Sequence, residues 1–138
     1  MRLPSEDEIN IHNSLDEISA SKHFLNKTLQ EAEALFQENS AYYQEDLMWM
    51  GSQAFQFYLQ AVINYLKSEH SLGDDHLIDC LYEIVVFRSQ QDGFLVALDR
   101  VKEMINYVIE NYAKFDVDED VYGDLLGKYR QLQSQLKE

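Results

Sequence analysis

The chain has 138 residues and a formal charge of −14 at pH 7, with 25 acidic side chains against 11 basic ones. A field of this sign repels phosphates and anionic lipids, so we expect neither nucleic acid nor a membrane as a partner. Hydrophobic residues make up 46% of the chain, which contains one proline and five glycines. This composition argues against global disorder and predicts a single helical domain spanning residues 1–138.

The N-terminal stretch predicts a cytoplasmic protein. Its first fifteen residues carry one arginine and several acids and lack the apolar region of a secretory signal. No apolar run in the sequence approaches the ~20 residues that span a bilayer. We therefore expect a cytoplasmic location.

The first helix is predicted to begin after Ser5, because Ser5 and Glu8 have the spacing of a capping box. On this interpretation Ile11, Leu15 and Ile18 share one face of the helix.

A second amphipathic helix is predicted between Lys22 and Glu38, where apolar residues recur every three or four positions. Residues 42–50 are predicted to form a short helix or an ordered connection. The apolar positions of the second helix are Leu25, Leu29, Ala32 and Phe36.

Residues 52–68 are predicted to form the central helix, with Ser52 as its N-cap. Its sequence, SQAFQFYLQAVINYLKS, is apolar on nearly every side. A helix of that kind in a soluble protein is buried, so we expect the core of the fold here.

Three further elements are predicted in the C-terminal half. Asp74 is placed to cap a helix with one apolar face, and a long amphipathic helix follows from Phe94 to Tyr112. The last helix, from Tyr122 to Leu136, has a coiled-coil-like seam that packs on the bundle or on a partner helix. The face after Asp74 consists of Leu77, Ile78, Leu81, Ile84, Val85 and Arg88. The sequence thus predicts an all-α, single-domain bundle of about five or six helices around a central hydrophobic helix.

The spacings that helical enzymes require are missing. The sequence has no Glu-x-x-His pair, no HExxH, no serine elbow and no glycine-rich phosphate loop. Asp116, Asp118 and Asp120 match the start of a calcium loop, but Val121 replaces its glycine and Gly127 its final glutamate. We interpret these acids as favourable charges at a helix start, and expect no catalytic residue and no cofactor.

Isolated reactive residues are interpreted as structural. Cys80 is the single cysteine, which excludes an intrachain disulfide and a cysteine-based zinc site. With Leu77 and Leu81 beside it, we interpret Cys80 as an inert buried thiol that would need a histidine brought close by the fold to act as a nucleophile. His12 and His23 are each interpreted as surface histidines.

The alternative to an interaction protein is a metal-dependent helical-bundle enzyme that uses the region from His70 to Asp79. His70 and His76, with Asp74, Asp75 and Asp79, form the one cluster with metal-ligand chemistry. The cluster surrounds a predicted turn, where polar residues are expected anyway, so no metal site is predicted.

Residues before the central helix form the candidate binding site. Tyrosine and tryptophan offer large, rigid contact areas with a polar group, and they are enriched at binding hot spots. The predicted partner-binding residues are Tyr42, Tyr43, Glu45, Asp46 and Trp49.

The segment DLMWMGSQAFQFYLQAVINYL, with YAKFDVDEDVYGDLLGKYR downstream, resembles small acidic all-helical bacterial proteins of uncharacterised function. The shared pattern is one of packing, so the resemblance implies a helical fold and no catalytic residue. In size and charge the chain also resembles the small acidic proteins with which bacteria neutralise partner toxins.

The leading hypothesis is a non-catalytic cytoplasmic protein-interaction module, in its most specific form an immunity-type inhibitor of a basic partner protein. A homodimer through the C-terminal helix, residues 122–136, is a further hypothesis.

Overall fold

The computed structural model describes residues 2–137, and this part of the chain contains helices and no strand. The predicted all-α class is therefore confirmed. The helices are α1 (Glu6–Ile9), α2 (Leu15–Phe24), α3 (Leu29–Tyr43), α4 (Asp46–Trp49), α5 (Ser52–Lys67), α6 (Asp75–Arg88), α7 (Leu98–Glu110), α8 (Glu119–Tyr122) and α9 (Leu125–Gln135), with 3₁₀ turns η1 (Glu69–Ser71), η2 (Phe94–Ala97) and η3 (Tyr112–Phe115).

The predicted number of five or six helices is wrong, since residues 2–137 form nine. Two of the connections between helices contain asparagines in the left-handed region, Asn13 with φ 56° and Asn26 with φ 65°, which follow the C-caps Asn10 of α1 and Leu25 of α2. Asparagine tolerates this conformation, which cannot continue a right-handed helix. Gly123, with φ 72°, separates α8 from α9 in the same way.

The first helix is shorter than predicted, and its predicted apolar face is wrong. The capping box of Ser5 and Glu8 is present, and α1 then ends at Ile9. Hydrogen bonds from the Arg2 side chain and the Ser5 backbone lower the pKa of Glu8 to about 2. The residues of the predicted face lie on both sides of the loop at Asn13 and are exposed by 43% or more. They are Ile11, Leu15 and Ile18.

The predicted helix from Lys22 to Glu38 is in fact two helices. The chain leaves α2 at Phe24, and Thr28 starts α3 with a second capping box, formed with Glu31. The apolar pattern remains correct for α3, because Ala32 and Phe36 are fully buried.

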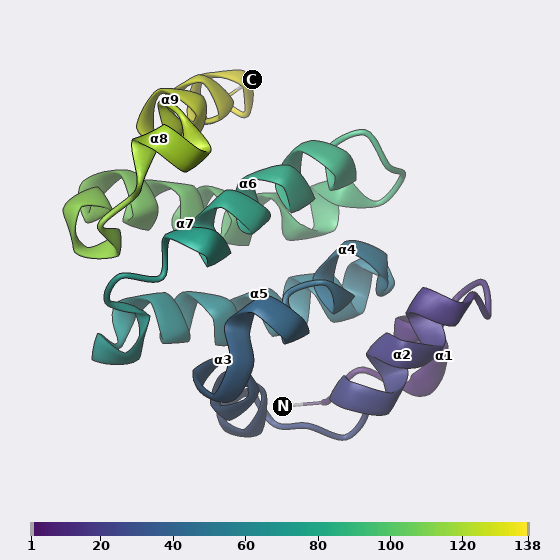
Figure 1. Cartoon of the computed structure of the whole chain (residues 1–138). Coiled ribbons are helices and arrows are strands. Elements are labelled where there is room, and N and C mark those ends of the chain that lie inside the picture. The colour runs from purple at the N-terminus through teal and green to yellow at the C-terminus, as the bar shows by residue number, and fades with distance from the viewer. Residues whose placement is uncertain (1, 138) are drawn as a thin grey trace.

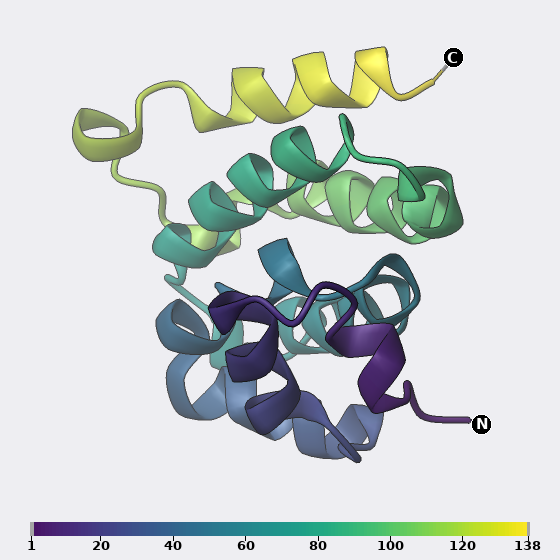
Figure 2. The same ribbon diagram turned by 90° about the vertical axis from the view of Figure 1, so that its right-hand side faces the viewer.

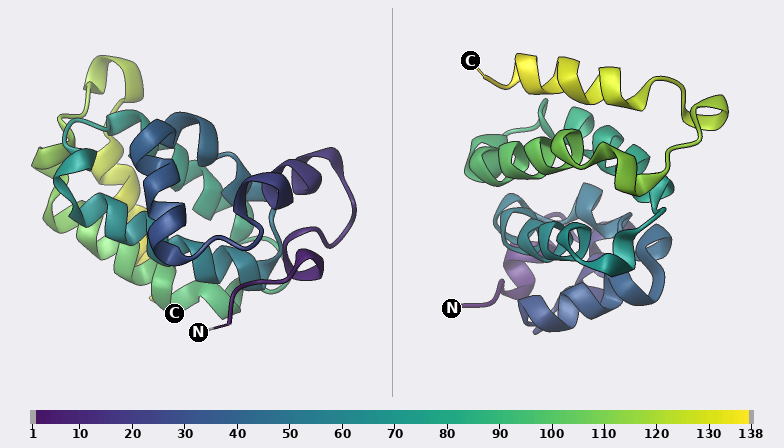
Figure 3. Two further views of the ribbon diagram at one scale, coloured as in Figure 1. Left: turned by 90° about the horizontal axis from the view of Figure 1, so that it is seen from below. Right: turned by 90° about the vertical axis from the view of Figure 1, so that its left-hand side faces the viewer.

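The helices form a stack with α5 near its middle (Figure 1). On one side α5 contacts α1 and α3, and on the other it contacts α7. Helix α9 covers α6 and α7 at the far end, so the chain termini lie at opposite ends of the stack (Figures 2 and 3). Within residues 2–137 no helix combines the length and the apolar character needed to cross a membrane.

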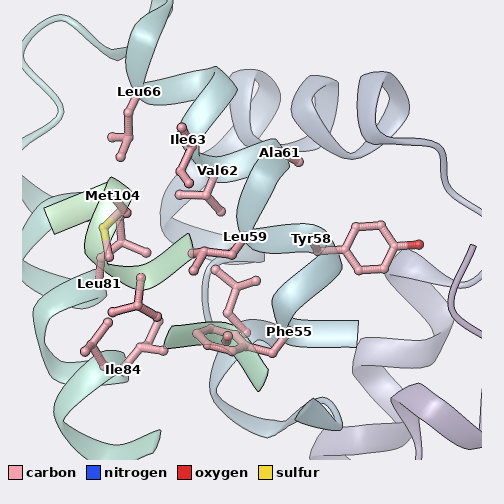
Figure 4. Packing of buried hydrophobic residues seen from close by; sticks show 14 of the residues in the cluster. Phe55, Tyr58, Leu59, Ala61, Val62, Ile63, Leu66, Leu81, Ile84 and Met104 are labelled. Carbon is pink, nitrogen blue, oxygen red and sulfur yellow. The ribbon is translucent and has the colours of Figure 1, made fainter. Parts of the chain in front are cut away.

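The central helix is confirmed as the core element. The predicted N-cap is wrong, because the helix begins at Ser52 and its N-cap is Gly51; ten of its residues are buried. Leu59 points toward Leu81, Ile84 and Met104, whereas Tyr58 points the other way, toward the N-terminal helices (Figure 4). There its hydroxyl lies 2.7 Å from the carbonyl oxygen of Phe24. Both sides of α5 are therefore occupied by the rest of the chain, which explains why its sequence is apolar all round.

The C-terminal half follows the predicted pattern with shorter helices. Asp74 caps α6 by accepting a hydrogen bond from the Leu77 amide, as predicted. The predicted helix from Phe94 to Tyr112 is a 3₁₀ turn followed by α7. The predicted last helix, from Tyr122 to Leu136, is divided in the structure. Tyr122 is the last residue of α8, and α9 begins at Leu125.

The seam of the last helix packs within the chain. Its buried residues face α6 and α7, and the Tyr129 hydroxyl donates a short hydrogen bond of 2.5 Å to the carbonyl oxygen of Ile78. Three of the five seam residues, Leu125, Tyr129 and Leu132, are therefore buried within the chain, whereas Tyr122 and Leu136 are partly exposed. The homodimer stays a prediction.

Candidate protein-binding site

Helix α4 is a single turn between α3 and α5, and it carries the predicted site. Asn39, with φ −161° and ψ 82°, interrupts α3, and its side chain accepts a hydrogen bond from the Tyr42 amide to start a new turn. Helix α4 begins at Asp46 without a side-chain cap. A helix of one turn has little stability of its own, so its position depends on neighbouring elements.

Arg88, at the end of α6, holds α4 in place. Its Nη1 lies 3.0 Å from the carbonyl oxygens of Leu47 and Met48 and 2.7 Å from that of Met50. The guanidinium carbon also lies 4.3 Å from the centre of the Phe55 ring. Burial lowers the pKa of Arg88 to about 10, which leaves the group charged at neutral pH. Arg88 therefore satisfies the carbonyls at the end of α4 and joins α4 to α5 and α6.

The five predicted site residues face two directions. Tyr42, Glu45 and Trp49 are exposed. Tyr43 packs partly against the core, and Asp46 is buried with 5% of its surface exposed. The structure therefore divides the predicted set into an outer group that a partner could contact and an inner pair that supports it.

His23 joins the outer and inner groups, because it hydrogen-bonds to Asp46 and Tyr42 and packs against the ring of Tyr43. Asp46 Oδ2 lies 2.7 Å from His23 Nδ1, and the Tyr42 hydroxyl lies 3.3 Å from His23 Nε2. A neutral ring that donates Nδ1–H to the carboxylate leaves Nε2 to accept the Tyr42 proton. The rings of Tyr42 and Tyr43 each lie edge-on to His23, with centroids 5.2 Å away. The interpretation of His23 as an isolated surface histidine is wrong, because the fold brings α2 against α4.

Substituting Asp46 with asparagine tests this buried contact. Desolvation raises the pKa of Asp46 and outweighs the hydrogen bond from His23, which lowers it. The folded state thus holds the Asp46 proton more tightly than the unfolded state, so the contribution of Asp46 to stability is present below its ordinary pKa of 3.8 and is lost as the pH rises through the folded value.

We expect Asp46→Asn, which keeps the acceptor for His23, to equal or exceed the wild type in stability by up to about 1 kcal/mol at pH 7. This advantage should disappear near pH 3.5, as measured by denaturant unfolding at a series of pH values. A variant that is less stable by more than about 2 kcal/mol at pH 7 would show that the charge itself stabilises the fold.

An exposed aromatic pair lies on the outer side of α4. The rings of Trp49 and Phe87 are T-shaped with centroids 5.5 Å apart, and 41% and 37% of their surfaces are exposed. Sequence reasoning found Trp49 but not Phe87, whose apolar neighbours in α6 suggested only a buried helix face. We call these two residues the aromatic pair.

Two grooves meet at α4, and Met48 and Trp49 line both. The α2 groove, of about 390 Å³, lies beside the start of α2 and includes Asp16, Glu17 and Asp92. The α6 groove, of about 370 Å³, has the following lining residues: Gln44, Glu45, Met48, Trp49, Asp79, Cys80, Glu83 and Ile84.

The α6 groove is negatively charged. Glu45, Asp79 and Glu83 line it, and its lining includes no basic side chain. Burial, with smaller contributions from these three carboxylates and Asp74, raises the pKa of the Cys80 thiol to about 11. The thiol is therefore protonated at neutral pH, although the fold places His76 Nε2 3.5 Å from its sulfur atom. The chemistry agrees with the interpretation of Cys80 as inert, while its exposure is intermediate and not that of a core residue.

Two of the acids in the region considered for a metal, Asp74 and Asp75, make structural contacts. Asp74 accepts hydrogen bonds from Ser40, Tyr65 and the Leu77 amide. Asp75 accepts one from the amide of Asp118. Among residues 2–137 no group of three or more histidine, cysteine, aspartate and glutamate side chains is arranged to hold a metal ion.

The chain matches no protein-family model, no curated protein and no solved structure. The surface around α4 must therefore be interpreted from its own geometry and charge.

Proposed function

We propose that this protein is a non-catalytic protein-interaction module whose binding surface is the aromatic pair and the two grooves beside it. The observation that carries the proposal is the exposure of two aromatic rings in contact with each other, 41% for Trp49 and 37% for Phe87. Exposed aromatic side chains that are held rigidly bury a large area on binding at a small entropic cost. Arg88 provides that rigidity by fixing α4.

The charge of the molecule supports a basic partner. The two grooves together contain six acidic side chains, and the whole chain carries a formal charge of −14. Such a field speeds the encounter with a basic surface and disfavours acidic ones. An immunity-type inhibitor that covers a basic partner protein in the cytoplasm is the specific form of this proposal.

Capture of a partner from the host, at low and at high salt, tests the proposal. We expect Trp49→Ala to weaken binding of the captured protein at least tenfold, or about 1.4 kcal/mol or more, because a central aromatic contact is lost. Its free energy of unfolding should change by about 1 kcal/mol or less, since the side chain is partly exposed. Calorimetric titration with the purified partner measures the first effect and denaturant unfolding the second.

Leu72→Ala is the matched control, because Leu72 is also an exposed apolar residue, at 63%, but lies before the start of α6. It should leave binding unchanged. Failure to recover any protein partner at low salt would overturn the proposed module. If Trp49→Ala binds the captured protein as tightly as the wild type does, the binding surface lies elsewhere on the molecule.

A further inference from the structure

The α6 groove is lined by apolar side chains and by carboxylates from two elements of the chain. Met48, Trp49 and Ile84 supply the apolar surface. Glu45 belongs to the turn before α4, whereas Asp79 and Glu83 belong to α6. An occupant that matches this lining presents an apolar group together with positive charge.

The carboxylates of this groove are available to a partner. The four ion pairs found among residues 2–137 do not include Glu45, Asp79 or Glu83, and no hydrogen bond within this range uses their carboxylate oxygens. Carboxylates that lack a cation within their own chain favour a cationic ligand. The negative charges of Glu45, Asp79 and Glu83 also contribute to the raised pKa of the Cys80 thiol, which lines the same groove.

The spacing of the charges favours a helix as the occupant. Asp79 and Glu83 are four residues apart on α6, which places them on the same face about 6 Å apart along its axis. Basic side chains three or four residues apart on a second helix have the same spacing. The groove volume of about 370 Å³ is at the lower end for ligand pockets, so it accepts apolar side chains from one face of such a helix rather than the helix itself.

We infer that the α6 groove is the docking site for a cationic amphipathic helix of the protein partner, with apolar side chains of that helix against Trp49 and basic side chains on Asp79, Glu83 and Glu45. This inference rests on the proposed function and names the class of partner. It assigns the contact to the α6 groove and not to the α2 groove, where the basic side chains of Arg88 and His12 also contribute to the lining.

Trp49 is the single tryptophan of the chain, so its fluorescence reports on the two grooves that it lines, and the variants below distinguish them. The probe is a designed helical peptide of about 18 residues, long enough to form a helix, with leucines on one face and lysines on both flanks. We expect a blue shift on titration into the full-length protein and an affinity that falls as salt is added. A control peptide with glutamates in place of the lysines should cause no shift.

Two double variants with the same change in net charge locate the site. Asp79→Asn/Glu83→Gln should weaken binding of the lysine peptide at least tenfold, whereas Asp16→Asn/Asp92→Asn, in the α2 groove, should change it less than threefold. Equal effects of the two variants would overturn the assignment to the α6 groove. Spermine binding as tightly as the peptide, with the same fluorescence shift, would overturn the assignment of a helix.

The two proposals can fail separately. If the partner captured from the host depends on Trp49 but binds Asp79→Asn/Glu83→Gln as well as it binds the wild type, the inference about the α6 groove is wrong and the interaction module stands. If the captured partner does not depend on Trp49, the proposed surface itself is wrong.

Discussion

Replacement of Arg88 by alanine is expected to destabilise the fold by about 3 kcal/mol and to abolish partner binding. The substitution leaves the carbonyl oxygens of Leu47, Met48 and Met50 without their donor, in a site where Arg88 itself is 93% buried. Each buried acceptor that loses its hydrogen bond costs on the order of 1 kcal/mol or more, and the contact with the Phe55 ring is lost as well. Denaturant unfolding measures the first effect, and titration with the captured partner measures the second.

Arg130→Ala is the control, because it removes the same charge from an exposed position of α9. Arg88→Lys should recover only part of the stability, since an ammonium group cannot reproduce the planar guanidinium against the Phe55 ring. An Arg88→Ala protein within about 1 kcal/mol of the wild type would contradict the role given to Arg88.

The second large effect is expected at Gly51, which joins α4 to α5. A Cβ atom at this position would collide with the carbonyl oxygen of Glu8 and the side chain of Ile11. The Gly51 amide also donates a hydrogen bond of 3.1 Å to the carbonyl oxygen of Ile9. Since the backbone of α1 would have to move, we expect Gly51→Ala to cost about 3 kcal/mol in unfolding free energy.

Amide hydrogen exchange should show which elements Gly51→Ala destabilises. We expect faster exchange in α1 (Glu6–Ile9) and in the first turn of α5 than in the wild type. Ser52→Ala, one residue along, adds no atom to the contact and should behave as the wild type. Unchanged stability of Gly51→Ala would mean that α1 does not depend on this close approach.

Local patterns in the sequence predict much of the fold. The apolar character of α5 on every side predicts a buried central helix, and Phe55, Leu59 and Leu66 are buried as expected. The capping signals at Ser5 and Asp74 predict true helix starts. Periodicity fails where the backbone leaves the helical region, as it does from Asn10 and from Leu25 onward, because the spacing of apolar residues on either side of the break is unaffected.

The candidate site is only partly predictable, because its contacts join distant parts of the chain. Trp49 was predicted from its residue type and its position before the core helix. Its contact with Phe87, and that of His23 with Asp46, depend on how α4 packs against α6 and α2. Arg88 gave one usable signal, since it lies on the apolar face of α6 where a charged residue must find partners.

Hydrogen–deuterium exchange of the full-length protein, with and without its captured partner, tests the location of the binding surface most directly. We predict that the partner slows exchange in residues 44–50 and 79–88, which carry Trp49, Phe87 and the residues that line the α6 groove. Slower exchange confined to other elements, for example α8 and α9, with no change in these two segments, would contradict the account.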